Sequence, residues 1–313
     1  MKLFRTEIKP AKIFAGELDW KSKFTALGSC FAENISSQFN SLGVDIISNP
    51  IGILYNPESI ANFISNSINK IQWTDKDLIS YENKHYFPFV QNMREQAPQF
   101  LNSQQDLFES RLKSPGVICI TFGTAWAYRL KSNQRTVANC QKLPSKYFER
   151  SIIELEKSLK NWSQLIKKID SINPETKWIF TISPVRHLRD NYRDNQISKS
   201  LLHLLVDGIV KNQKNCHYFP SYEIMMDDLR DYRFYKDDMT HPNQQAIDYI
   251  FDKFISSAFS EQSCSYFAEA AKILAMQNHK LIDPTSEDSQ KFLESLQNKL
   301  KIFQGKYPES KLY

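Results

Sequence analysis

The chain has 313 residues, 41% of them apolar and 13% aromatic, and its 40 basic and 35 acidic residues leave a net charge of +5. This composition supplies a full core for one large α/β domain with an appendage, or for two small domains. The sequence contains no block of five or more consecutive basic residues, so a dedicated nucleic-acid surface is not indicated.

The N-terminal residues lack the apolar core of about 7–15 residues that marks a signal peptide. No apolar run reaches the roughly 18 residues that a membrane span requires. The five cysteines are odd in number, widely spaced and without a CxxC pair, as is typical of a reducing compartment. His187 and His203 have no Cys or carboxylate at ligand spacing beside them. We therefore expect a cytoplasmic protein that has no membrane span, no metal and no cofactor.

The first chemical feature of the chain is a predicted turn at Ser29. Residues 1–23 are expected to form a leader strand or an extended arm, residues 24–27 a strand, and residues 31–42 a helix. A small residue followed by serine makes a sharp strand-to-helix turn. Such a turn lifts the serine hydroxyl to the C-terminal edge of a parallel sheet, near free helix N–H groups. This placement suits a nucleophile; the alternative is that Ser29 only caps the helix.

The rest of the chain alternates between predicted strands and helices. Strands are expected at residues 44–48, 116–123, 178–182 and 217–219, and helices at residues 57–69, 99–112, 147–172, 197–210 and 243–259. The run 116–123 is apolar throughout, which indicates a central strand buried on both faces. This order predicts an α/β fold: a three-layer α/β/α domain around a five-stranded, doubly wound parallel sheet.

Two regions stand apart from this alternation. Residues 70–97 have mixed periodicity with scattered aromatic residues, and we interpret them as an insertion that walls one side of a pocket. Residues 261–313 form a helical C-terminal extension to the domain of residues 1–260. In its last helix, apolar residues recur at three- and four-residue steps, at Leu293, Leu296, Leu300 and Phe303. This seam is expected to pack back on the parent domain; the alternative is a homodimer contact.

The second chemical feature is the motif Asp238-x-x-His241. An Asp three residues before a His, in a turn that enters a helix, can reach the imidazole Nδ1 and leave Nε2 free to accept a serine proton. The alternative is a helix-capping Asp beside a surface His. Because loops that follow parallel strands gather at one edge of the sheet, Ser29, Gly52, Arg186 and the Asp238–His241 turn are expected to lie together there.

An early Gly-Ser turn combined with a late Asp-x-x-His resembles the SGNH/GDSL-like hydrolases, and the whole pattern resembles their GSCFA-domain subfamily. The matching stretches are GSCFAEN at 28–34, NPIG and YNP within 49–57, TFGTAW at 121–126, VANC and KLP within 137–144, SPVRH at 183–187, and DYRFY and DMTHP within 231–242. The resemblance covers residues 20–255. It implies a flavodoxin-like hydrolase fold and an ester or acyl substrate.

The resemblance also implies roles for individual residues. Ser29 matches the nucleophile, His241 the base, Asp238 the residue that orients the base, and Gly52 the glycine whose N–H joins that of Ser29 in the oxyanion hole. The chain departs from the superfamily at Ala125, where an oxyanion Asn is expected. Asn139 or Asn56 is the candidate replacement, with Asn139 preferred. Gln141 and Phe87 stand where the subfamily often has histidines.

Four alternatives accompany this interpretation. Cys30 is a rival nucleophile, because a helix N-terminus can lower the pKa of a thiol. Arg186 and His187 are expected to bind an anionic or carbonyl group of the substrate, although Arg186 could instead pair with Asp190. The predicted function is that of a serine esterase or acyl hydrolase acting on a small-molecule or carbohydrate-borne ester. The alternatives are an acyltransferase and a binding or scaffold protein that kept the fold without turnover.

Overall fold

A five-stranded parallel sheet forms the centre of the protein. The structure, a computed structural model, describes the chain except for residues 1–5, 83, 91–96, 141–142, 188–189 and 313. The strands lie in the order β10-β9-β5-β1-β2, and every neighbouring pair is parallel. Their bounds are β1 (Lys23–Gly28), β2 (Ile46–Ser48), β5 (Gly116–Phe122), β9 (Lys177–Ile182) and β10 (Cys216–Phe219). The predicted sheet is therefore confirmed.

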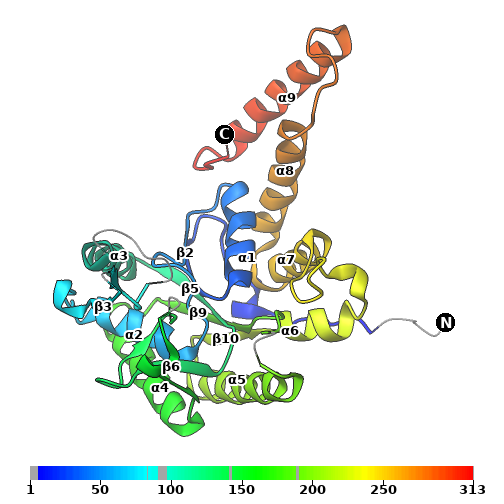
Figure 1. The fold of residues 1–313 in the computed structure, drawn as a ribbon. Coiled ribbons are helices and arrows are strands. Elements are labelled where there is room, and N and C mark those ends of the chain that lie inside the picture. Colours follow the sequence, from blue (N-terminus) through cyan, green and yellow to red (C-terminus); the bar gives the residue numbers. More distant parts are fainter. Residues whose placement is uncertain (1–5, 83, 91–96, 141–142, 188–189, 313) are drawn as a thin grey trace.

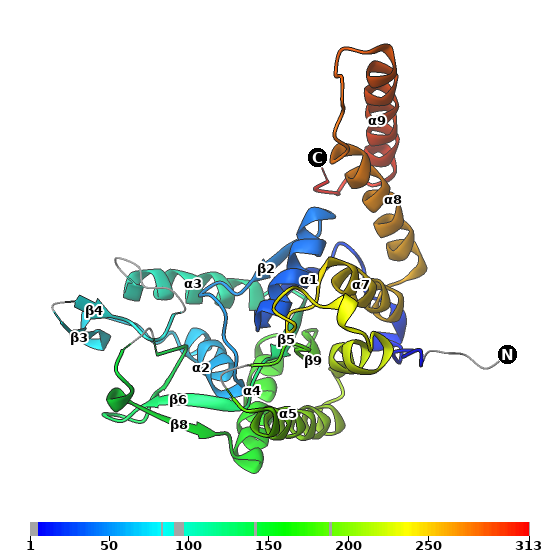
Figure 2. The ribbon, with the colours of Figure 1, turned by 45° about the vertical axis from the view of Figure 1, so that its right-hand side comes forward.

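Helices cover both faces of this sheet and give the predicted three layers (Figures 1 and 2). One face carries α1 (Cys30–Ser41) and α7 (Gln244–Ala258); the other carries α2 (Pro57–Ile68), α4 (Leu155–Ile172) and α5 (Tyr192–Asn212), with α3 (Ala97–Leu112) packed on α2. Val117, Ile118 and Ile120 of β5 are all buried, because this central strand has a helical layer on each side.

Outside the sheet, the strand prediction is incomplete. Residues 148–152, expected as the start of a helix, instead form β8 (Phe148–Ile152), and α4 begins only at Leu155. The strand β8 pairs antiparallel with β6 (Trp126–Leu130), which also pairs with β7 (Thr136–Val137). Phe148 faces Leu130 across this ladder, and both side chains are buried. The burial of this pair shows that tertiary pairing outweighs the local helical pattern.

The insertion and the N-terminal arm also differ in detail from the expectation. Within residues 70–97 the chain forms a small hairpin from β3 (Ile79–Tyr81) and β4 (Lys84–Tyr86). Where a leader strand or an extended arm was expected, residues 6–22 form no strand; they contain a short 3-10 turn, Ile13–Gly16, and a single bridge between Leu18 and Phe259. The helix predicted at 197–210 is longer, because Asn191 caps it at its N-terminus.

The C-terminal extension is a helical hairpin of α8 (Glu261–Gln277) and α9 (Glu287–Lys306) that projects from the α/β body (Figures 1 and 2). Its end returns to the body: Phe303 and Tyr307 are buried around Tyr266, whose ring stacks on Trp20 at 3.9 Å. Packing on the parent domain is thus confirmed for the end of the seam, whereas Leu293 is 40% exposed. The homodimer stays a prediction. No helix in the described part of the chain is long and apolar enough to cross a membrane.

Candidate active site

Apart from Asn139, the predicted site residues lie on loops at the same edge of the sheet. Ser29 follows β1, Gly52 follows β2, the pair Arg186 and His187 follows β9, and the Asp238–His241 turn lies between β10 and α7. In a parallel sheet the carboxyl ends of the strands meet at one edge, which explains this gathering.

The serine turn is tightly constrained. Gly28 has φ +139°, and a Cβ at this position would lie 2.1 Å from the Thr121 carbonyl oxygen, so only glycine fits. The Ser29 N–H donates to that same oxygen at 3.0 Å. The Ser29 Oγ accepts a hydrogen bond from the Phe31 N–H at 3.3 Å, and the residue is only 1% exposed. In this conformation the hydroxyl therefore caps α1.

Residues from the loop after β2 hold this turn in place. The Asn49 side chain accepts a hydrogen bond from the Gly28 N–H at 2.8 Å. The Tyr55 carbonyl accepts from the N–H groups of Gly123 and Thr124 at 2.8 and 3.0 Å. A Cβ at Gly123 would lie 3.2 Å from Ser29 Cβ, so the loop after β5 runs directly beside the serine. Sequence reasoning did not identify Asn49 or Tyr55 as supports.

The histidine turn forms the predicted pair. Asp238 Oδ2 lies 2.6 Å from His241 Nδ1, while Oδ1 accepts from the N–H groups of His241 and Thr240, each at 2.9 Å. The hydrogen bond from the His241 N–H, followed by that from Thr240, holds the pKa of Asp238 well below its usual value. The Asp238 and His241 side chains are 46% and 39% exposed.

The structure brings Asp238 and His241 into contact, but the described residues include no hydrogen bond between Ser29 and His241. His187 contacts the loop that supports the serine turn and lies near enough to His241 for the two charges to interact. Its ring packs edge-on against Tyr55 at 5.3 Å between centroids, and the charge of His241 contributes to lowering its pKa. Burial is the largest cause, followed by the charge of Lys199, and together they lower the pKa of His187 to about 4. His187 is therefore neutral near pH 7.

The groups predicted to donate hydrogen bonds in the oxyanion hole differ in whether they are already hydrogen-bonded. Besides the Ser29 N–H, the Gly52 N–H is also engaged, since it donates to Asn49 O at 2.8 Å. Ala125 is buried and its N–H donates to Ser198 Oγ at 2.8 Å. Asn56 caps α2 through Oδ1, which accepts from Ser59 N at 2.9 Å, and its Nδ2 has no acceptor in the described part of the chain.

Asn56 is better placed than Asn139. Asn56 follows directly on Tyr55, whose carbonyl binds the loop beside Ser29, whereas the backbone N–H of Asn139 lies 3.4 Å from the Pro88 carbonyl, in the insertion. Of the two positions where the subfamily often has histidines, Phe87 is buried in the core, and Gln141 lies outside the described residues.

A buried lysine at the site was missed by sequence reasoning. Lys199 is 1% exposed, and its Nζ donates to the carbonyl oxygens of Gly123 and Ser183, both at 2.7 Å. Burial, and next the charge of Arg186, lower the pKa of Lys199 to about 7. The available signal was spacing: Lys199 lies three and seven residues before Leu202 and Val206, on the buried face of α5.

The rival nucleophile and the alternative ion pair can both be assessed. Burial raises the pKa of the Cys30 thiol, and the charge of Glu33 adds to this effect, which disfavours the thiolate. Asp190 pairs with Arg150, and no ion pair between Arg186 and Asp190 forms among the described residues. The five cysteines are free, and no group of three metal-ligating side chains forms among the described residues.

With this geometry established, comparison with known proteins identifies the family. The family model described as GSCFA matches residues 23–254. The chain belongs to the GSCFA family. No curated protein matches it.

Two solved structures are similar to this GSCFA protein at low identity. One is described as a candidate platelet activating factor from Streptococcus pneumonia. It is 10% identical, the match covers 75% of this chain and 84% of the other chain, and the TM-score is 0.40. The other is a carbohydrate esterase family 3 protein from Talaromyces cellulolyticus. It is 8% identical, the match covers 80% of this chain and 99% of the esterase chain, and the TM-score is 0.35.

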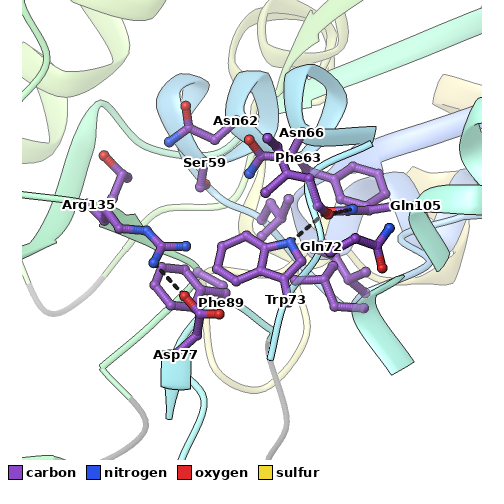
Figure 3. Close-up of a pocket in the computed structure, with 16 residues that line it drawn as sticks. Ser59, Asn62, Phe63, Asn66, Gln72, Trp73, Asp77, Phe89, Gln105 and Arg135 are labelled. Carbon is purple, nitrogen blue, oxygen red and sulfur yellow. Dashed lines mark hydrogen bonds and ion pairs between the residues drawn. The ribbon is translucent and has the colours of Figure 1, made fainter. Parts of the chain in front are cut away.

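The insertion walls a cavity, as expected, in this GSCFA protein. The cavity, of about 480 Å³, is lined by Trp73, Asp77 and Phe89 from the insertion and by polar residues of α2 (Figure 3). Trp73 Nε1 donates to Gln105 Oε1 at 2.8 Å, and Arg135 pairs with Asp77 at 2.7 Å. Neither Ser29 nor His241 lines this cavity, so it is distinct from the serine and histidine turns.

Proposed function

We propose that this GSCFA protein is a serine esterase or acyl hydrolase. The observation that carries the proposal is the 2.6 Å contact between Asp238 and His241 Nδ1 at the sheet edge that also carries Ser29. A carboxylate at Nδ1 fixes the tautomer and leaves Nε2 free as a base. The substrate class is an ester of a small molecule or of a carbohydrate.

The reaction follows from these roles. Ser29 Oγ bonds to the ester carbonyl carbon as its proton passes to His241 Nε2, and Asp238 stabilises the imidazolium. The proton then leaves on the departing alcohol as the ester C–O bond breaks. Water, activated by the same imidazole, releases the acid from the serine. If an alcohol replaces water in this last step, the product is a new ester, which is the acyltransferase alternative.

Ser29 must change its hydrogen bond for this reaction. Its hydroxyl accepts from the Phe31 N–H at 3.3 Å, near the long end of the range for a hydrogen bond. Rotation about χ1 releases this contact at a cost of about 1 kcal/mol. Catalytic hydrogen bonds are often long or absent before substrate binds, so the present geometry is compatible with the proposal.

The test combines labelling of the serine with kinetics. A fluorophosphonate probe should label the wild-type protein at Ser29, identified by mass spectrometry of the digested protein. On a short-chain aryl ester, Ser29→Ala and His241→Ala should each lower kcat/KM by roughly 10⁴–10⁶, and the double variant should be little worse, because the two residues act as one unit.

The matched control is Cys30→Ala, which should keep most of the activity. An inactive Cys30→Ala with an active Ser29→Ala would reverse the nucleophile assignment. A folded wild-type protein that neither labels nor turns over esters would favour the alternative of a binding or scaffold protein.

A further inference from the structure

A second cavity, of about 570 Å³, opens beside the histidine turn. Asp238 and Thr240 border it from that turn, and Arg186 borders it from the loop after β9. The remaining walls are Tyr192, Met226, Arg230, Asp231, Tyr232, Tyr235 and Met239. Because Asp238 belongs both to this wall and to the pair with His241, a molecule in the cavity lies next to the proposed base.

Arg186 is partly buried in the wall, and it forms no ion pair with any carboxylate in the described part of the chain. Its Nη2 lies 3.8 Å from Met226 Sδ, a weak acceptor. Its charge reaches the phenols of Tyr222 and Tyr235, where it opposes the rise in pKa that burial causes. A partly desolvated guanidinium without a counterion is unfavourable, so an anion from outside the chain would complement it.

The two carboxylates that border the cavity do not serve as that counterion. Asp238 is bound to His241 and Thr240. Asp231 accepts from the Arg233 N–H at 2.9 Å, and its Oδ2 lies 3.8 Å from Arg233 Nε. Arg230 adds a second guanidinium at the rim. The lining of the cavity therefore holds two guanidinium and two carboxylate groups, but both carboxylates are bound within their own turns, so Arg186 has no carboxylate bound to it in the described part of the chain.

Large side chains gather at the mouth of this cavity in an exposed state. Tyr192 and Tyr232 are 77% and 76% exposed, and Met239 is 55% exposed. Exposed aromatic rings grouped around a cavity, unlike scattered ones, indicate a surface that packs against a ligand. The chemistry of the cavity thus combines a guanidinium in the wall with aromatic and thioether surface at the mouth.

We propose that this cavity binds a carboxylate or phosphate group of the substrate, with Arg186 as the counterion, so that the protein selects anionic esters. This inference rests on the proposed esterase function. The planar guanidinium can bind two oxygens of either anion at once. The tyrosines cover the less polar part of the same substrate.

The experiment measures charge preference with matched esters. In the first pair, the 4-nitrophenyl ester of glutarate is compared with the same ester whose free carboxylate is methylated; in the second, 4-acetoxyphenyl phosphate is compared with phenyl acetate. Wild-type kcat/KM should favour the anionic member of at least one pair by roughly 10- to 100-fold, the value of one charge-assisted contact. Arg186→Gln should bring this ratio close to 1.

The control variant is Arg193→Gln. Arg193 belongs to the same region of α5 as Tyr192 but lines a different hollow, so its removal tests for a general effect of positive charge. It should keep the wild-type ratio. The carboxylate and phosphate pairs separate the two anion sources.

Binding is measured separately, so that failure of the proposed function can be recognised. Calorimetry with monomethyl glutarate and with phenyl phosphate should give an affinity that Arg186→Gln lowers about tenfold or more. Anion binding that depends on Arg186 without ester turnover would support the cavity assignment and contradict the esterase function. Turnover with equal rates on both members of each pair, or anion binding unchanged in Arg186→Gln, would overturn the assignment and leave the esterase function standing.

Discussion

The serine turn and the histidine turn are built in opposite ways. Ser29 is buried, and its turn depends on contacts with Asn49 and Thr121, which are 21 and 92 residues away from Gly28 and Ser29. The Asp238 and His241 side chains are about half exposed, and their turn is held by hydrogen bonds that span two to five residues, the longest from the Lys236 N–H to the His241 carbonyl. The first turn is a product of the whole fold, whereas the second is a local motif. Substitutions of the residues that support the serine turn should therefore lower stability, whereas substitutions within the Asp238–His241 turn should lower activity with little effect on stability.

Replacing Gly28 should have the largest effect. In Gly28→Ala the new Cβ meets the Thr121 carbonyl oxygen at 2.1 Å, and φ +139° is strained for any L side chain. We expect the free energy of unfolding to fall by at least about 3 kcal/mol, or folding to fail, in urea denaturation followed by circular dichroism. Gly305→Ala, where nothing lies within 4 Å, is the control and should be neutral or stabilising by about 0.5–1 kcal/mol. Equal stability of the two variants would contradict the view that the serine turn is tightly constrained.

Asp238→Asn should separate activity from stability at the other turn. The Asn oxygen can still accept from the backbone N–H groups of Thr240 and His241, so the turn and the Tm should change little. The Asn Nδ2 group, which replaces Asp238 Oδ2 beside the ring, is a donor and cannot accept from His241 Nδ1–H. The tautomer that leaves Nε2 free as a base is therefore no longer favoured. We expect kcat/KM on an aryl ester to fall by about 10⁴. A fall in Tm that accompanies the loss of activity would show that the turn is not a purely local motif.

The difference between the turns also decides what could be predicted from sequence. The Asp238–His241 contact follows from three-residue spacing, and the five parallel strands follow from apolar runs, because both signals are local. The alternative in which Ser29 caps the helix rests on a local signal as well. Asn49 was missed, because its contact with the Gly28 N–H exists only after β1 and β2 pair.

Two further errors have physical causes of the same kind. Residues 148–152 were assigned to a helix because the pattern continues into α4, whereas pairing with β6 makes them a strand. Lys199 was not identified from the sequence, because a charged side chain on an amphipathic helix normally faces water. Its burial depends on two carbonyl oxygens supplied by β5 and β9 loops, which no local pattern encodes.

The oxyanion side chain offers a sharper test between two asparagines. Asn56 both caps α2 through Oδ1 and carries a free Nδ2. Asn56→Asp keeps the capping oxygen and removes the amide donor, so a selective loss of kcat by roughly 10²–10³ would assign the donor role to Asn56. Asn139→Ala tests the residue preferred from sequence, and the same loss there would assign the role to Asn139. In both cases KM should change little, since the contact strengthens mainly in the transition state. Normal kcat in both variants would leave backbone N–H groups as the donors.

The smallest effect we expect is a pH dependence of stability that originates at Lys199. The pKa of Lys199 is lowered to about 7 in the folded protein, against about 10.4 for a lysine in an unfolded chain. Between these values the unfolded chain binds one more proton than the folded protein, so stability contributed at this site rises as pH increases. A neutral amine has two N–H groups, which match the two carbonyl acceptors, Gly123 O and Ser183 O.

The free energy of unfolding of the wild type, relative to that of Lys199→Met, should therefore increase between pH 7 and 9 by at most about 1.4 kcal/mol per pH unit. Urea denaturation at each pH measures this difference. Lys211→Met, in the same helix but with its ammonium in water, is the matched control and should show no such slope. Parallel curves for the wild type and Lys199→Met would mean that the amine stays charged in the folded protein, and that the serine side of the site carries a buried positive charge near pH 7.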